Sequence, residues 1–226
     1  MRTKIIATIG PATLDPIIFN KVLDAGVNFI RINTSYGDYN QYDKILNNLK
    51  NHPEKDNVKV IYDIKKPEVL DYFLKNNLDY IAVSFAASKS QMEEVQKQAP
   101  NAKLISKIES IEGVKNFDEI LDFSWGVMVA RGDLGKAECL ENIPCLQKRF
   151  TKKTLEKGKF LIVATEMLLS MTENREPSRA EVSDVANAVF DKASAVMLSE
   201  ETAIGKYPVE VVQYMKKIIE SAEKCC

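Results

Sequence analysis

The chain has 226 residues, of which 45% are hydrophobic and 28% charged, so it can bury a full core and falls in the length range of one domain. Its 31 basic and 32 acidic residues give a formal net charge of -1. They form neither the basic stripe that nucleic acid needs nor a polybasic membrane patch. No apolar run reaches the roughly 18 residues of a membrane span, and the amino terminus lacks a signal-peptide pattern. We therefore expect one cytoplasmic domain, residues 1–226, that binds neither nucleic acid nor membrane.

The thiols do not indicate a metal centre. Cys139, Cys145, Cys225 and Cys226 lack metal-ligand spacing, and His52 is the only histidine. The sequence therefore predicts reduced thiols. Cys225 and Cys226 fit a frayed tail better than the alternative of a lipidation or redox site.

In chain order, short β-branched runs alternate with amphipathic stretches of helical period, eight of each. The predicted strands are Lys4–Ile9, Asn28–Asn33, Lys59–Ile64, Tyr80–Phe85, Lys103–Ile108, Gly126–Arg131, Phe160–Thr165 and Ala195–Ser199. The predicted helices are Pro16–Ala25, Tyr39–Asn51, Pro67–Asn76, Ser90–Gln98, Gly113–Asp122, Leu146–Lys157, Arg179–Lys192 and Pro208–Lys224.

Strict alternation implies a parallel sheet covered by helices, and eight units at this length fit closure into a single (β/α)8 TIM barrel. The alternative is an open doubly wound sheet. It needs fewer strands or a glycine-rich first turn, and Gly10–Thr13 lacks that fingerprint. The two longer connections, residues 132–144 and 166–178, follow strands six and seven, where loops form the catalytic face of a barrel.

Polar side chains recur at the carboxyl ends of five predicted strands. They are Arg31, Asn33, Ser35, Asp63, Lys107, Glu109, Asp133 and Thr165. Solvation at the barrel rim or pairing with a neighbour explains any one of them equally well, but a buried strand end needs no charge for stability, so the agreement of five strands favours a binding site.

The residue types at these ends indicate a hard cation and an anion. Glu109 and Asp133 are carboxylates that could hold Mg²⁺ or Mn²⁺ together with substrate oxygens, whereas zinc does not fit. Arg31 and Lys107 would supply positive charge for a phosphate or a developing enolate. Gly132 allows close approach of the backbone to a ligand, and a short helix starting near Asp133 would direct amide groups at a carboxylate.

Several segments closely resemble pyruvate kinase, and the resemblance covers nearly the whole chain in order. They are Thr3–Ala12 (TKIIATIGPA), Ile105–Glu109 (ISKIE), Met128–Gly135 (MVARGDLG), Ala164–Leu168 (ATEML), Arg179–Val189 (RAEVSDVANAV) and Met197–Ala203 (MLSEETA).

This resemblance implies a phosphoenolpyruvate/pyruvate-binding barrel with assigned residues. It implies that Glu109 and Asp133 are divalent-metal ligands, and that Arg31, Lys107, Gly132, Asp133 and Thr165 contact phosphoenolpyruvate. Lys107, Thr165 and Arg31 would be catalytic. The family's potassium site falls on Asn33, Ser35, Asp63 and the carbonyl of Ile64, where the family usually has threonine.

The departures from the family concern the nucleotide. The family's lid domain follows strand three, but here Asp63–Glu68 runs directly into the third helix, so we expect no lid; nor do we expect the family's carboxyl-terminal regulatory domain. Tyr36 replaces a histidine, Ile204 a lysine, and Leu70 aligns with an arginine. ADP should therefore bind weakly.

Two changes add negative charge near the expected site: Glu166 replaces a glutamine and Glu200 a glycine. Each could strengthen metal binding, act as an acid or base, or be solvated.

Three functions fit these residues. The first is phosphoryl transfer between phosphoenolpyruvate and a nucleoside diphosphate, with Lys107 stabilising the enolate and Thr165 helping to deliver a proton. The second is another metal-dependent reaction of a pyruvate enolate, such as aldol cleavage, oxaloacetate decarboxylation or phosphate transfer to a different acceptor. The third is a non-catalytic phosphoenolpyruvate sensor. A homo-oligomer is compatible with each, and the sequence leaves the co-substrate open.

Overall fold

The computed structural model describes residues 2–65 and 69–225. Its strands are β1 (Lys4–Thr8), β2 (Phe29–Asn33), β3 (Lys59–Ile64), β4 (Tyr80–Val83), β5 (Lys103–Ile108), β6 (Gly126–Ala130), β7 (Phe160–Ala164) and β8 (Ala195–Leu198). The α-helices are α1 (Pro16–Asp24), α2 (Tyr39–Asn51), α3 (Leu70–Lys75), α4 (Lys89–Gln98), α5 (Ile111–Lys115), α6 (Phe117–Phe123), α7 (Arg131–Ala137), α8 (Ile143–Glu156), α9 (Arg179–Phe190), α10 (Glu200–Ala203) and α11 (Pro208–Glu223). Short 3-10 turns cover Pro11–Thr13, Leu140–Asn142 and Leu169–Thr172.

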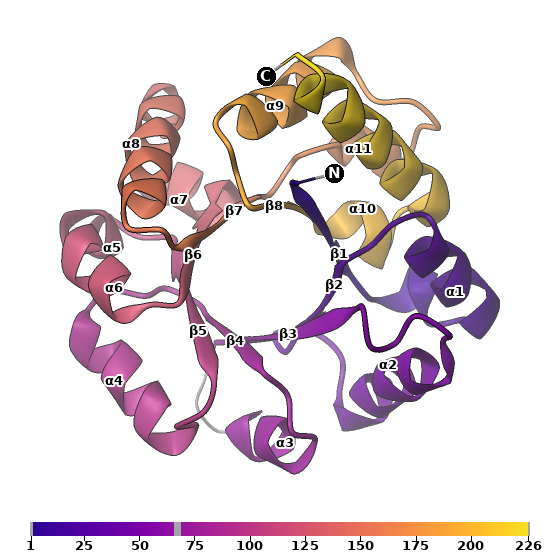
Figure 1. Ribbon diagram of the computed structural model, residues 1–226, viewed down its shortest axis with the longest axis horizontal. Helices are drawn as coiled ribbons and strands as arrows, with labels where there is room; N and C mark the ends of the chain where they lie inside the picture. Colours follow the sequence, from indigo (N-terminus) through magenta and orange to yellow (C-terminus); the bar gives the residue numbers. More distant parts are fainter. Residues whose placement is uncertain (1, 66–68, 226) are drawn as a thin grey trace. The chain divides into compact units, whose positions relative to one another are not determined.

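The strands follow one another in sequence order around a closed, parallel, eight-stranded barrel (Figure 1). Parallel strands covered by helices are buried on both faces, so their sequences are continuous apolar runs. β6 illustrates this, since all five of its residues are buried. The prediction of a (β/α)8 barrel is confirmed, and the open doubly wound sheet is excluded.

The chain divides into two compact units. One comprises residues 1–60 and 165–226 and contains β1, β2 and β8. Here β1 is the central strand, because Thr8 pairs with Arg31 of β2 and Ala7 pairs with Leu198 of β8. The other unit comprises residues 61–164 and contains β4 to β7 in continuous register.

Side-chain caps fix where many of the helices begin. Asp15, Asp38, Ser88, Ser110 and Ser178 each accept a hydrogen bond from a backbone N–H in the first turn of the helix that follows. Such caps satisfy backbone donors that have no partner within the helix.

The predicted helix Gly113–Asp122 is wrong in one respect, because it consists of two helices, α5 and α6, that separate at Asn116. The Asn116 side chain donates to the carbonyl of Ala87 at 2.7 Å, a bond that favours a break in the helix. A Cβ on Gly113 would lie 2.5 Å from the Ala86 carbonyl oxygen, so the start of α5 requires glycine.

Other predicted boundaries shift by a few residues; the short helix predicted near Asp133 is observed as α7, whereas the short helix α10 was not predicted. Strands β1, β4, β6, β7 and β8 end one or two residues before their predicted ends. The predicted start of the third helix at Pro67 lies outside the described residues; α3 begins at Leu70.

Within the described residues, none of the helices combines the length and hydropathy of a membrane span. Cys139, Cys145 and Cys225 are free and exposed, in agreement with the predicted reduced thiols. Cys226 lies outside the described residues.

Candidate functional site

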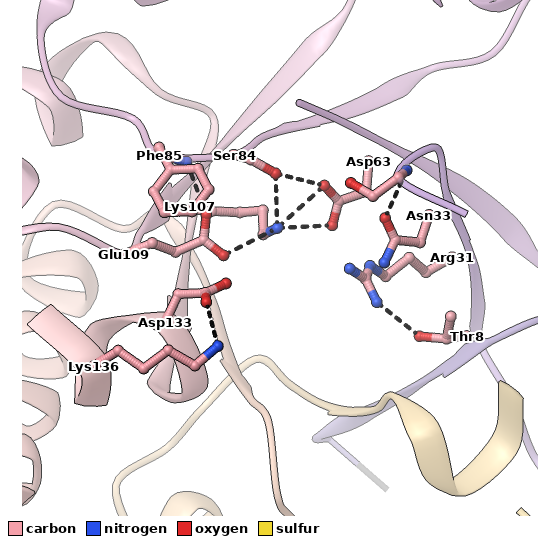
Figure 2. A network of polar contacts seen from close by, with 11 residues as sticks. Thr8, Arg31, Asn33, Asp63, Ser84, Phe85, Lys107, Glu109, Asp133 and Lys136 are labelled. Atoms are coloured by element: carbon pink, nitrogen blue, oxygen red, sulfur yellow. Dashed lines mark hydrogen bonds and ion pairs between the residues drawn. The ribbon is translucent and has the colours of Figure 1, made fainter. Parts of the chain in front are cut away.

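Lys107 is the centre of a buried polar cluster at the end of β5. Its Nζ lies 3.2 Å from both carboxylate oxygens of Asp63, 2.9 Å from Ser84 Oγ and 3.1 Å from Glu109 Oε1 (Figure 2). The lysine is 6% exposed and the two carboxylates are 1% and 3% exposed. Because β3, β4 and β5 are neighbours, three strand ends supply these side chains.

Glu109 is held from two directions. Its Oε1 faces Lys107, and its Oε2 accepts the N–H of Phe85 at 2.8 Å. Phe85 has φ +51°, a left-handed conformation that is uncommon outside glycine and occurs often at functional sites. Burial raises the pKa of Glu109, while the charge of Lys107 and the Phe85 N–H oppose that rise.

Asp133 supplies the second carboxylate predicted to bind a metal. It lies in the first turn of α7, directly after β6, and its side chain is 43% exposed. Since β6 pairs with β5, Asp133 and Glu109 leave neighbouring strand ends, and Figure 2 shows the Asp133 carboxylate pointing toward that of Glu109. Lys136, one helical turn further on, pairs with Asp133 at 2.9 Å.

These two carboxylates fit a magnesium site better than a site made by protein ligands alone. Among the described residues there is no group of three or more His, Cys, Asp or Glu able to hold a metal ion. Mg²⁺ commonly takes one or two carboxylates and completes its shell with water and substrate oxygens. Glu109 and Asp133 offer the hard oxygen donors for that arrangement, and the predicted helix near Asp133 is observed as α7, which starts at Arg131 and includes Gly132.

Arg31 lies on β2 in the other unit, and Thr8 orients it. The guanidinium Nη1 donates to Thr8 Oγ1 at 3.1 Å, and that hydroxyl donates to the carbonyl of Leu198 at 2.9 Å (Figure 2). The Thr8 carbonyl in turn accepts from the Thr202 hydroxyl at 2.8 Å. Arg31 is 7% exposed, so a buried cation at the end of β2 is held in a fixed network.

Thr165 and Glu166 follow β7 in a strained backbone conformation. Their φ angles are +76° and +54°. For a β-branched residue such as threonine this is an outlier, and strain of this kind persists where the surrounding structure fixes it. Glu166 and Glu200, the two carboxylates that depart from the family pattern, are both exposed in this unit.

The residues predicted to bind a monovalent cation come from both units. Asn33 Oδ1 accepts the N–H of Ser35 at 3.1 Å in one unit, while Asp63 and Ile64 belong to the other. The monovalent site therefore stays a prediction.

Sequence reasoning missed three residues that organise the site: Thr8, Ser84 and Glu201. Thr8 and Ser84 stand at the ends of β1 and β4, the same position that identified Arg31 and Lys107, but both are uncharged. A criterion that included uncharged polar residues at strand ends would have identified Thr8 and Ser84. Glu201 lies within a recognised motif, although nothing in the sequence predicted its burial.

The fold and these side chains define a (β/α)8-barrel protein with lysine, arginine and paired carboxylates at its strand ends. The profile of the family described as pyruvate kinase, barrel domain, matches residues 1–71 and 68–212. The chain belongs to the pyruvate kinase family, and the resemblance seen in its motifs is confirmed.

Individual relatives named pyruvate kinase differ in how much they align. The protein from Thermococcus litoralis is 47% identical over 161 residues, which are 70% of this chain and 34% of that protein. The one from Dictyostelium discoideum is 45% identical over 166 residues, 71% of this chain and 33% of that protein. The one from Chlamydia muridarum is 32% identical over 333 residues, 99% of this chain and 69% of that protein. The chain thus spans between a third and about two thirds of these relatives.

Proposed function

We propose that this chain carries a Mg²⁺-dependent site for phosphoenolpyruvate and the enolate of pyruvate, of the type that supports phosphoryl transfer. The observation that carries the proposal is the buried Lys107 ammonium among Asp63, Ser84 and Glu109. An enolate oxygen develops negative charge during the reaction, and an ammonium group fixed at this strand end would stabilise it.

Each of the other residues has a role in this proposal. Glu109 and Asp133 would hold Mg²⁺, or Mn²⁺ in its place, and the ion would neutralise charge on the ligand oxygens. Arg31 would bind the phosphate, Gly132 and Asp133 would contact the carboxylate through α7, and Thr165 would help to move a proton to the methylene carbon. K⁺ would bind at Asn33, Ser35, Asp63 and the carbonyl of Ile64.

A second candidate is a different reaction of the same enolate, namely aldol cleavage, oxaloacetate decarboxylation or phosphate transfer to another acceptor. The short connection between β3 and α3 favours it, because it leaves no room for a lid domain between Ile64 and Leu70. The alignment to the chlamydial relative is longer than this chain, so that relative has internal segments that this chain lacks. Leu70 is 2% exposed and apolar, so the position aligned with an arginine offers no charge to a nucleotide.

The test is exchange of the pyruvate methyl protons with solvent deuterium, measured by NMR with and without Mg²⁺, beside a coupled assay of phosphoryl transfer to ADP. Exchange that requires Mg²⁺ supports the enolate site, and kinase turnover in the same preparation selects phosphoryl transfer. Exchange without kinase turnover selects the second candidate. Binding of phosphoenolpyruvate with neither activity would contradict both and indicate a sensor.

A further inference from the structure

The loop that follows β7, residues 165–178, begins with the two strained residues Thr165 and Glu166. A left-handed threonine costs free energy and reverts to an ordinary conformation unless its neighbours prevent this. The contacts that hold the first residues of this loop therefore bear directly on the conformation of Thr165.

Glu201 of α10 makes the contact that closes the start of the loop. Its Oε1 accepts the N–H of Leu168 at 3.1 Å, and its Oε2 accepts the N–H of Ser199, at the end of β8, at 2.7 Å. Glu201 is 0% exposed, as are the side chains of Met167 and Leu168. The carboxylate thus fixes the backbone only three residues after Thr165.

We propose that Glu201 is a positioning residue that keeps Thr165 in its strained conformation, a role that rests on the proposed function of Thr165 in proton delivery. A local role at the start of α10 accounts for the bond to Ser199 but not for the bond to Leu168, which is 33 residues away in sequence. Burial raises the pKa of Glu201, so keeping a carboxylate at this position opposes desolvation. The two backbone hydrogen bonds offset that cost and join β8 to the loop.

The same short helix also supports Arg31. Thr202, the neighbour of Glu201, donates to the carbonyl of Thr8, whose hydroxyl accepts from Arg31. A Cβ on Gly10 would lie 2.7 Å from the Ala203 carbonyl oxygen, so close packing of α10 on the segment after β1 requires glycine there. In this unit α10 therefore contacts both segments that carry proposed substrate-binding residues.

A second glutamate holds the loop further along and provides a matched control. Glu181 of α9 accepts from the N–H of Ser170 at 2.6 Å, from its hydroxyl at 2.5 Å and from the N–H of Ser178 at 2.7 Å. Like Glu201, it binds backbone N–H groups of two residues through its carboxylate. It contacts the loop five residues after Thr165, so its loss should leave the conformation of Thr165 unchanged.

The test is a double-mutant cycle of melting temperatures with Thr165→Gly and Glu201→Gln, run on the full chain. Glycine tolerates positive φ, so Thr165→Gly removes the cost of the left-handed conformation. This gain should appear only when Glu201 is present to impose that conformation. We expect the change in melting temperature caused by Thr165→Gly to be more favourable by about 2 °C or more when Glu201 is intact than in Glu201→Gln. With Glu181→Gln in place of Glu201→Gln, the effect of Thr165→Gly should stay the same. Equal effects of Thr165→Gly with and without Glu201→Gln would overturn the proposal.

Kinetics separate positioning from a general loss of stability. Glu201→Gln should lower kcat for pyruvate proton exchange roughly tenfold and change KM much less, because Arg31, Lys107 and the proposed metal ligands still bind substrate while Thr165 is misplaced. A rise in KM with unchanged kcat contradicts the role. If the unmodified protein shows no exchange, the proposed function fails, but the temperature cycle still decides whether Glu201 holds Thr165.

A measurement on the unmodified protein covers the case in which Glu201→Gln does not fold. The Leu168 amide should exchange with solvent as slowly as amides of β7, since it donates to a buried carboxylate. Exchange as fast as in an exposed loop would overturn the proposal.

Discussion

Lys107 and Glu109 form a buried ion pair in which Nζ lies 3.1 Å from Oε1, with side chains 8% and 3% exposed. They are two residues apart, so both point to the same face of β5 and its extension. The same lysine also pairs with Asp63, which leaves one buried cation between two buried carboxylates. Both buried carboxylates therefore depend on this lysine for compensation of their charge.

Lys107→Met should therefore be strongly destabilising. Removing the ammonium leaves Asp63 and Glu109 buried without their shared cation, and such losses cost about 3–5 kcal/mol. Denaturant unfolding measures the loss, with Lys97→Met at an exposed position of α4 as the control. A Lys107→Met protein as stable as Lys97→Met would show that the cluster does not depend on the pairing.

Magnesium binding should weaken in mild acid. The affinity should begin to fall at a higher pH than it would if the ligand were an exposed carboxylate. Burial raises the pKa of Glu109, so a proton competes with the cation at a pH above the range near 4.3 where exposed glutamates titrate. The affinity for Mg²⁺ is therefore greatest above the raised pKa of Glu109 and falls as the pH drops through that pKa. Calorimetric titrations with Mg²⁺ over this range give the profile. Constant affinity down to the range of exposed glutamates would contradict the assignment of Glu109.

Thr8→Val should weaken binding of phosphoenolpyruvate and also lower stability, because Arg31 and the Leu198 carbonyl both lose their hydrogen bond to the buried Thr8 hydroxyl. Valine matches threonine in shape but cannot accept the hydrogen bond from Arg31, so the guanidinium loses its orientation. A hydrogen bond to a charged group is worth about 1.5–3 kcal/mol, which corresponds to roughly tenfold or more in affinity. Thr154→Val is the matched control, because the buried Thr154 hydroxyl has no hydrogen-bond partner among the described residues. Equal affinities of the two variants would remove Thr8 from the site.

Phosphoenolpyruvate with Mg²⁺ should raise the melting temperature much more than ADP does. A ligand stabilises the folded state by RT ln(1 + [L]/Kd), so weak binding gives a small shift. Leu70 is buried, and the exposed Tyr36 and Ile204 replace family residues with side chains that carry no charge. Thermal melts with each ligand at equal concentration provide the comparison. A large shift with ADP would mean that other groups replace the missing nucleotide contacts.

The alternation of strands and helices in the sequence was sufficient to predict the barrel, because each β-branched run is a strand whose register closes the sheet. Contacts distant in sequence explain the failures. The break at Asn116 depends on the carbonyl of Ala87, and the buried position of Glu201 depends on the amide of Leu168. Neither partner can be identified from local periodicity.

The site was predictable where charge marked a strand end, and less so elsewhere. Asp63, Lys107 and Glu109 lie together, as their positions at strand ends predicted. Ser84 was missed because a serine at a strand end is ordinary, although its hydroxyl lies 2.9 Å from Lys107 Nζ. The strain at Thr165 is a backbone property that residue type does not reveal.

Binding of oxalate, an analogue of the pyruvate enolate, tests the central claim most directly. Calorimetric titration of oxalate should show binding that requires Mg²⁺, and Glu109→Gln and Asp133→Asn should each abolish it while circular dichroism shows an intact barrel. Asp118→Asn, at an exposed carboxylate on α6, should bind oxalate as the unmodified protein does. Binding that is the same without Mg²⁺, or that survives in both Glu109→Gln and Asp133→Asn, would contradict a magnesium-dependent enolate site in this chain.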